Sequence, residues 1–95
     1  MKKLNQGWVE GSAAEFLDLT PADMEYIETR RALSRQLRME RQRKHLTQTE
    51  LATRLKTSQS RVAKMEQGDA TVSLDLLIQS LYRVGMTRKE VAAVL

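Results

Sequence analysis

Polar side chains recur at helical spacing between residues 58 and 68. If this segment is a helix, one of its faces carries Gln59, Ser60, Ala63, Lys64 and Gln67. That face offers amide, hydroxyl and ammonium groups, and residues 51–65 contain no Asp or Glu. A glutamine can pair with the edge of adenine and a lysine with the acceptors of guanine. The pattern therefore favours hydrogen bonding to base edges in a major groove.

Positive charge is concentrated in the same part of the chain. The formal net charge is +4, yet residues 30–64 hold 11 basic and two acidic side chains, whereas residues 1–29 hold two basic and six acidic ones. Such a block suggests a polyanionic partner on one face. A solvated helix surface would explain the charge alone equally well.

The sequence offers few residues that could serve in catalysis or bind a metal. The chain has no cysteine and one histidine, His45, so a thiolate metal site is excluded and His45 lacks partners for catalysis. Glu50 is explained by capping of Thr47 three residues earlier. We therefore expect no enzymatic activity, no metal and no cofactor.

Membrane insertion and export are not expected either. The longest uncharged run has seven residues, 76–82, and a membrane span needs about 20 apolar residues. No apolar stretch follows Lys2 and Lys3, as a signal peptide would require. We expect a cytoplasmic protein of a bacterium or phage, associated with the nucleoid.

The elements that must position the polar face are marked by their ends. Four hydroxyl residues precede an acid by three positions, which is capping-box spacing: Ser12–Glu15, Thr20–Asp23, Thr47–Glu50 and Thr87–Glu90. Ser58 and Ser73 are simpler N-caps, and Gly68 and Gly85 mark helix ends. No stretch alternates with period two. The spacing predicts an all-α chain with helices over about 12–18, 21–44, 48–55, 59–67, 74–84 and 88–94.

The long second helix exceeds what a small domain needs, and a break near residues 29–31 is one expectation for it. Its first half carries Met24 and Ile27, which we expect to lie against the N-terminal segment or a partner. Trp8, Phe16 and Leu17 could form a small satellite core or a surface for a partner protein.

Residues 47–68 read as two helices joined by the short connection 56–58. So short a turn forces the second helix to cross the first at a steep angle. Helical spacing turns an apolar set inward: Leu51, Ala52, Leu55, Val62 and Met65.

This two-helix unit resembles the helix-turn-helix domain of Xre/Cro-like phage repressors. The matching stretches are Leu46-Thr-Gln-Thr-Glu-Leu-Ala, Ser58-Gln-Ser-Arg-Val and Met65-Glu-Gln-Gly68. The resemblance implies a five-helix, lambda-repressor-like DNA-binding domain over residues 30–95. Residues 1–29 would form an acidic N-terminal arm with an extra short helix and the start of the long helix.

The resemblance also implies roles for individual residues. The positions that match base contacts of the recognition helix are Gln59, Ser60 and Lys64. Those that match phosphate contacts are Thr47, Gln48 and Gln67, and Arg61, at the edge of the face, could reach a phosphate or a base. Gln48 suits this role because a helix N-terminus attracts anions. Arg41 and Glu66 match a structural ion pair.

Two positions depart from the family pattern. Glycine is frequent where this chain has His45 and Lys56, and a left-handed non-glycine residue carries strain of about 1 kcal/mol. Lys56 would recover some of that cost by facing a phosphate.

These features support two functions. The first is a sequence-specific repressor that binds double-stranded DNA as a homodimer on a palindromic operator, with Val91, Val94 and Leu95 either in the dimer interface or in ordinary core. The second rests on a resemblance of residues 7–17 and 68–74 to HigA-type antitoxins. It is an antitoxin that neutralises a cognate RNase toxin through its acidic residues 1–29 and autoregulates its operon.

Overall fold

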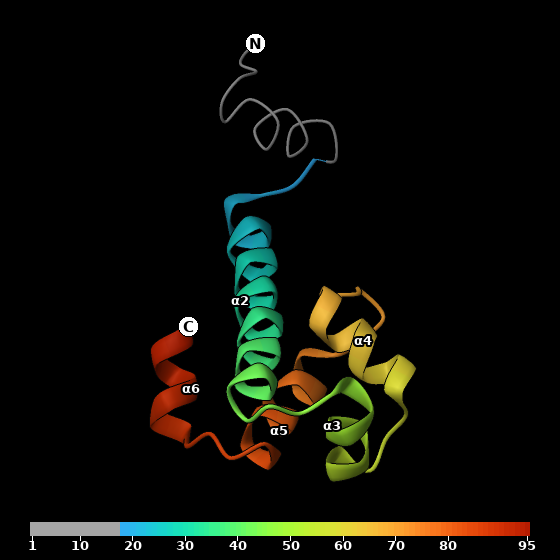
Figure 1. Ribbon diagram of the computed structural model, residues 1–95. Helices are drawn as coiled ribbons and strands as arrows, with labels where there is room; N and C mark the ends of the chain where they lie inside the picture. Colours follow the sequence, from blue (N-terminus) through green and yellow to red (C-terminus); the bar gives the residue numbers. More distant parts are fainter. Residues whose placement is uncertain (1–17) are drawn as a thin grey trace.

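The computed structural model describes residues 18–95, and this part of the chain forms five α-helices and no strand. The helices are α2 (Pro21–Arg43), α3 (Gln48–Leu55), α4 (Gln59–Gln67), α5 (Leu74–Arg83) and α6 (Arg88–Val94). The shorter helices surround the C-terminal half of α2, and the N-terminal end of α2 projects away from them (Figure 1). The all-α helix-turn-helix fold predicted from the sequence is confirmed.

Predictions for the first 17 residues lie outside the described part of the chain. They comprise most of the short helix over 12–18, the Ser12–Glu15 capping box and the roles of Trp8, Phe16 and Leu17. Asp18, the first described residue, lies in a turn.

The helices begin where their caps predict. Thr20, Thr47 and Thr87 each accept a hydrogen bond from the backbone N–H three residues later, and the acid at that position accepts one from the cap in return. Ser58 and Ser73 cap α4 and α5 through their hydroxyls. Each cap satisfies backbone donors that the first turn of a helix leaves without partners. Within residues 18–95, the predicted and observed ends of the helices agree to within one residue.

The expected break in the long helix does not occur. α2 runs without interruption from Pro21 to Arg43 and contains no glycine and no internal proline. The Thr29 hydroxyl donates to the carbonyl of Glu25 at 2.9 Å, one turn back. Arg30 ties the middle of the helix to the α4–α5 loop by donating to the carbonyl of Val72. This tertiary anchor, which no local pattern indicates, lies at the point where the break was expected.

One hydrophobic core joins all five helices. Leu33 and Leu37 of α2 are fully buried against α4 and α5. The inward set predicted for α3 and α4 is confirmed, since all five of these side chains are buried: Leu51, Ala52, Leu55, Val62 and Met65. Burial of this set holds the two helices at a fixed angle and leaves their polar faces outside.

Three described non-glycine residues have left-handed backbone conformations, and two of them flank α3. His45 has φ of 57° and Lys56 has φ of 59°. These are the two positions at which the sequence departs from the glycine of the family pattern, so both carry the strain of a left-handed non-glycine residue. Gly68, with φ of 74°, closes α4 in the same conformation without the Cβ penalty.

Candidate nucleic-acid interface

α3 and α4 form a helix pair whose connection is fixed by backbone hydrogen bonds. The N–H of Lys56 donates to the carbonyl of Thr53, and the N–H of Thr57 donates to the carbonyl of Ala52. The Ser58 hydroxyl then accepts from the N–H of Arg61 at 3.1 Å and starts α4. The left-handed Lys56 lets α3 end and α4 begin within three residues.

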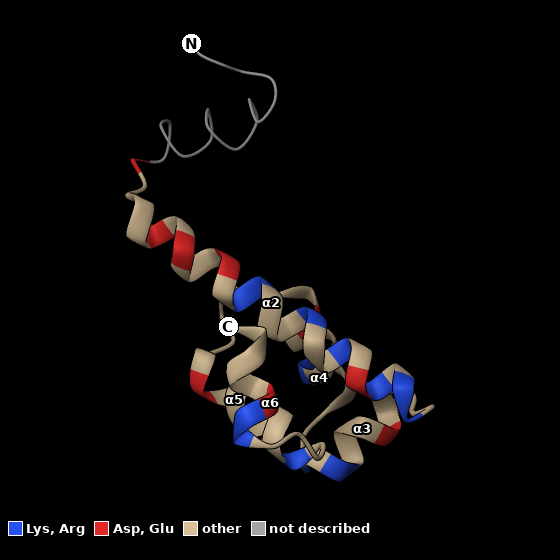
Figure 2. Ribbon diagram, turned by 90° about the vertical axis from the view of Figure 1, so that its left-hand side faces the viewer, with Lys and Arg blue, Asp and Glu red and all other residues tan. Residues whose placement is uncertain are grey.

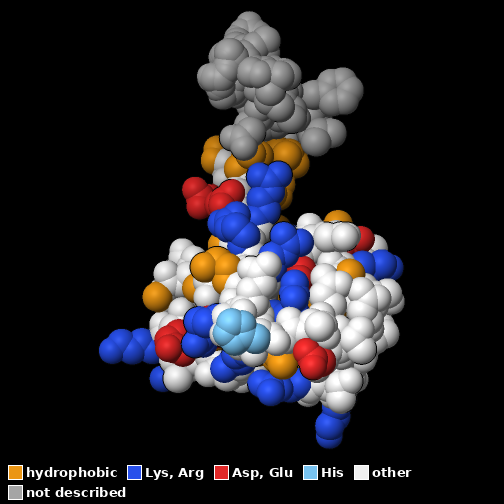
Figure 3. All heavy atoms as spheres, viewed as in Figure 1, with side chains coloured by type: hydrophobic (Ala, Val, Ile, Leu, Met, Phe, Trp, Pro, Cys, Tyr) orange, Lys and Arg blue, Asp and Glu red, His pale blue; other side chains and the backbone are white. Residues whose placement is uncertain are grey.

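The outer face of α4 is the polar surface expected from the sequence. Gln59, Ser60, Lys64 and Gln67 are exposed, and Ala63 is half-buried. Uncharged side chains cover much of the surface over α4, and Lys and Arg side chains lie around it (Figure 3). A face with donors, acceptors and little bulk allows close approach to base edges.

Most of the side chains expected to contact phosphates are exposed. Thr47, Lys56, Arg61 and Gln67 are exposed, and Gln48 is half-buried at the first position of α3. Lys and Arg residues follow the C-terminal half of α2 and occur on α3 and α4, whereas the projecting end of α2 carries Asp and Glu residues (Figure 2). This distribution places positive charge beside the polar face of α4.

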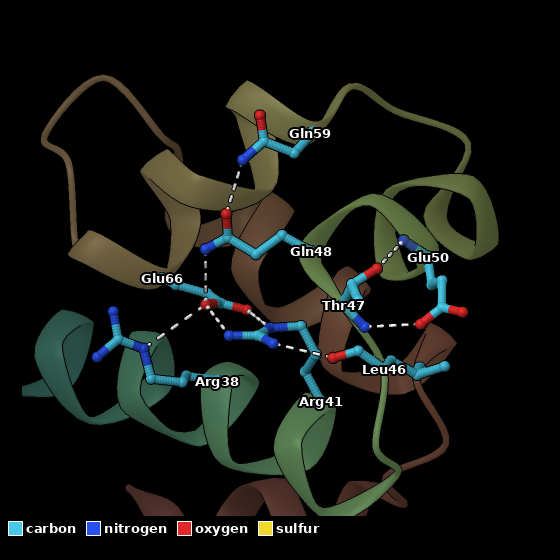
Figure 4. Close-up of polar contacts among 8 residues, drawn as sticks. All are labelled: Arg38, Arg41, Leu46, Thr47, Gln48, Glu50, Gln59 and Glu66. Carbon is cyan, nitrogen blue, oxygen red and sulfur yellow. Dashed lines mark hydrogen bonds and ion pairs between the residues drawn. The ribbon is translucent and has the colours of Figure 1, made fainter.

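A buried carboxylate lies behind the polar face. Glu66 has a fully buried side chain and receives two hydrogen bonds from Arg41, Nε to Oε2 at 2.6 Å and Nη2 to Oε1 at 3.0 Å (Figure 4). Arg41 also donates to the carbonyl of Leu46 at 2.9 Å. Arg41 therefore joins α2, α4 and the segment that leads into α3.

The electrostatics of Glu66 favour its ionised form. Burial alone would raise the pKa of this carboxyl. Hydrogen bonds from Arg41 and Gln48 and the charges of Arg41 and Arg38 outweigh burial and hold the pKa below its ordinary value of 4.5. The Nε of Arg38 lies 3.6 Å from Glu66 Oε1. Arg38 was missed by sequence reasoning, because half of its side chain is exposed on a helix rich in arginine.

Gln48 and Gln59, which the sequence assigned to separate roles, meet in the structure. The Nε2 of Gln48 donates to Glu66 Oε1 at 3.1 Å, and the Oε1 of Gln48 accepts from Gln59 Nε2 at 2.7 Å (Figure 4). One chain of hydrogen bonds thus runs from the buried Arg41–Glu66 pair to the start of α4. Residues 48 and 66 are too far apart in sequence for a helical period to link them.

The three residues expected at a dimer interface differ in how far they are exposed. Val91 is 3% exposed and belongs to the core of its own chain, Val94 is half-buried, and Leu95 is 66% exposed. Val91 therefore has little surface to offer a second copy.

The described residues also bear on metal binding and on membrane insertion. No group of three or more His, Cys, Asp or Glu residues within 18–95 is arranged to hold a metal ion. Within the same range, every helix is too short or too polar to cross a bilayer.

Comparison with known proteins supports the reading of the fold. A family model described as a helix-turn-helix domain matches residues 32–94, from the core half of α2 to the end of α6. No curated protein and no solved structure gives a significant match. The match covers the helix pair, its turn and the core that orients it, which indicates a DNA-binding regulator. The chain belongs to the helix-turn-helix domain family.

Proposed function

We propose that this protein is a sequence-specific transcriptional repressor of the Xre/Cro-like type that binds an operator as a homodimer. The observation that carries the proposal is the exposed, acid-free face of α4 beside the N-terminus of α3. Gln59, Ser60 and Lys64 would read base edges from this face. No enzymatic activity and no cofactor is proposed.

Phosphate contacts would hold α4 in the groove and set its register. The N-terminus of α3 offers backbone N–H groups and the positive end of the helix dipole, next to Thr47 and Gln48. Lys56, Arg61 and Gln67 lie exposed around the polar face. Contacts of this kind supply salt-dependent affinity without sequence information, whereas the base contacts supply the discrimination.

Two copies of the domain would explain recognition of a palindrome. A dimer places two recognition helices in successive major grooves, about 34 Å apart. The exposed Leu95 and the half-buried Val94 at the C-terminal end of α6 are the apolar groups proposed for the contact between copies.

The test is selection of bound duplexes from a random pool, followed by sequencing. The proposal predicts two inverted half-sites at a fixed spacing. Recovery of sequences with no common motif, at a salt concentration where the protein still binds DNA, would count against a sequence-specific function. Recovery of single half-sites would count against the dimer.

A second function is favoured by the projecting end of α2. Asp23, Glu25 and Glu28 are exposed on the N-terminal part of α2, where Asp and Glu residues are concentrated (Figure 2), and Glu28 pairs with Arg35 at 3.6 Å. An acidic surface suits a basic nuclease. We propose as the alternative a HigA-type antitoxin that neutralises an RNase toxin with this region and represses its own operon with α4.

This alternative is tested by co-expression with the product of any small basic gene next to the coding sequence. Reversal of the three acidic side chains to lysine should abolish co-purification and toxin neutralisation while operator binding is retained. Neutralisation that survives the reversal would exclude this surface from toxin binding.

A further inference from the structure

The orientation of the Gln48 amide is decided by the group behind it. Glu66 is ionised near neutral pH, because Arg41 donates two hydrogen bonds to its carboxylate, Arg38 lies 3.6 Å away, and its pKa is held below the ordinary value of 4.5. A carboxylate can accept hydrogen bonds but cannot donate one. Gln48 must therefore turn its Nε2 toward Glu66, and these atoms lie 3.1 Å apart.

The orientation of Gln48 in turn sets the orientation of the Gln59 amide. With Nε2 of Gln48 facing Glu66, the atom that faces α4 is Oε1, which can only accept. Gln59 meets it with Nε2 at 2.7 Å. The Oε1 of Gln59 and the second hydrogen on its Nε2 take no part in this link. One acceptor and one donor therefore remain at the start of α4.

We propose that Glu66 is a positioning residue that determines which amide atoms Gln59 presents to DNA. The inference rests on the proposed DNA-binding function and adds a base preference to it. One acceptor and one donor match the N6 amino group and N7 of adenine. The opposite orientation of Gln59 would present two donors, which match N7 and O6 of guanine. The charge on Glu66 thus favours adenine over guanine at one base pair.

Glu66→Gln gives the sharpest test of this claim. In this variant the side chain at position 66 has one oxygen. We expect that oxygen to stay on Arg41 Nε, which makes the shortest contact with the wild-type carboxylate, at 2.6 Å. The new amide nitrogen then replaces Oε1, loses the hydrogen bond from Arg41 Nη2, and faces Gln48, where it must find an acceptor. Gln48 has to turn over, and Gln59 turns over in response. The adenine-over-guanine preference should fall by about tenfold, which is the loss of one good bidentate contact.

Two further variants separate positioning from folding. Gln48→Met removes the connecting amide and leaves the Arg41–Glu66 pair in place. Glu50→Gln is the matched charge control, because Glu50 is exposed and glutamine can still accept from the backbone N–H of Thr47 in its capping box. Circular dichroism at the working temperature establishes that each variant is folded.

The first measurement uses the full chain without DNA. In ¹H–¹⁵N spectra, the side-chain amide signals of Gln59 and Gln48 are assigned by their disappearance in Gln59→Ala and Gln48→Met. We expect the Gln59 signal to shift in Glu66→Gln and in Gln48→Met but not in Glu50→Gln. A Gln59 signal that is the same in folded Glu66→Gln as in the wild type would overturn the link.

The second measurement uses the duplex recovered by selection. The base pair read by Gln59 is the one whose identity no longer matters to Gln59→Ala. At that base pair, Glu66→Gln and Gln48→Met should each lower the affinity ratio for A·T over G·C by about tenfold. Glu50→Gln should leave the ratio unchanged. In the Gln48→Met background, Glu66→Gln should have no additional effect on it.

These outcomes distinguish the inference from the proposed function. A preferred duplex whose A·T over G·C ratio is unchanged in folded Glu66→Gln refutes the positioning role and leaves the function intact. A pool without any preferred duplex refutes the function and the adenine reading together. In that case the amide spectra still decide whether Glu66 orients Gln59.

Discussion

The guanidinium of Arg41 and the carboxylate of Glu66 pair through two hydrogen bonds, at 2.6 and 3.0 Å, although 25 residues separate them in sequence. The Glu66 side chain is 0% exposed and that of Arg41 is 14% exposed. The pair joins α2 to α4 behind the polar face of α4.

Removal of one partner should destabilise the domain strongly. Arg41→Ala leaves a buried carboxylate without its main partner, and the expected loss is about 3–5 kcal/mol in the free energy of unfolding. Urea unfolding followed by circular dichroism measures it. Arg35→Ala is the control, because Arg35 and Glu28 form an exposed pair at 3.6 Å whose loss should change little. Equal effects of the two variants would show that the buried pair has no special role.

The same pair predicts a dependence of stability on pH. The folded-state pKa of Glu66 lies below its ordinary value of 4.5, so its contribution is fully present above that pH. It is lost as the pH falls from about 4.5 through the lower folded-state pKa. Chemical unfolding between pH 7 and pH 3 should show a steeper acid loss in the wild type than in Glu66→Gln. Parallel curves for the two proteins would exclude Glu66 as a source of the acid sensitivity.

Lys56 should strengthen DNA binding and lower the stability of the fold. Its backbone is left-handed, so Lys56→Gly relieves strain and should raise the free energy of unfolding by about 0.5–1 kcal/mol. Loss of one phosphate contact should also lower the slope of log affinity against log salt by about one. His45→Gly is the matched control at the other end of α3, with the same relief of strain and no loss of a lysine. A salt slope unaltered by Lys56→Gly would remove Lys56 from the interface.

Thr47 should combine a capping role with a role in binding. Thr47→Ala removes a helix cap and should cost about 1 kcal/mol of stability. Thr87→Ala removes an equivalent capping box from α6, which lies outside the proposed interface. Both variants should therefore lose similar stability, but only Thr47→Ala should weaken binding to every duplex. If the two variants bind DNA equally well, Thr47 acts as a cap alone.

Features set by neighbouring residues could be predicted from the sequence. Helix starts follow from hydroxyl caps such as Thr47 and Ser58, and the inward faces follow from the spacing of residues such as Leu51 and Val62. These signals lie within one or two turns of a helix. They were sufficient for the helix-turn-helix unit and for the exposure of its polar face.

Features that depend on distant contacts could not be predicted in the same way. The anchor of Arg30 on the carbonyl of Val72 spans 42 residues, and the link from Gln48 to Glu66 spans 18. The burial of Val91 depends on how α6 packs against α2 and α5. Nothing in the sequence separates Arg38 from the other arginines of α2. It is distinguished only by its distance of 3.6 Å to Glu66 Oε1.

The central claim is that the outer face of α4 reads bases. Competition titrations with Gln59→Ala test it most directly, with the selected duplex and a shuffled duplex of the same composition as competitors. The preference of the wild type for the selected duplex should fall by about 1–3 kcal/mol, while affinity for the shuffled duplex stays the same. A Gln59→Ala protein that keeps the full preference would contradict the assignment of α4 as the recognition helix.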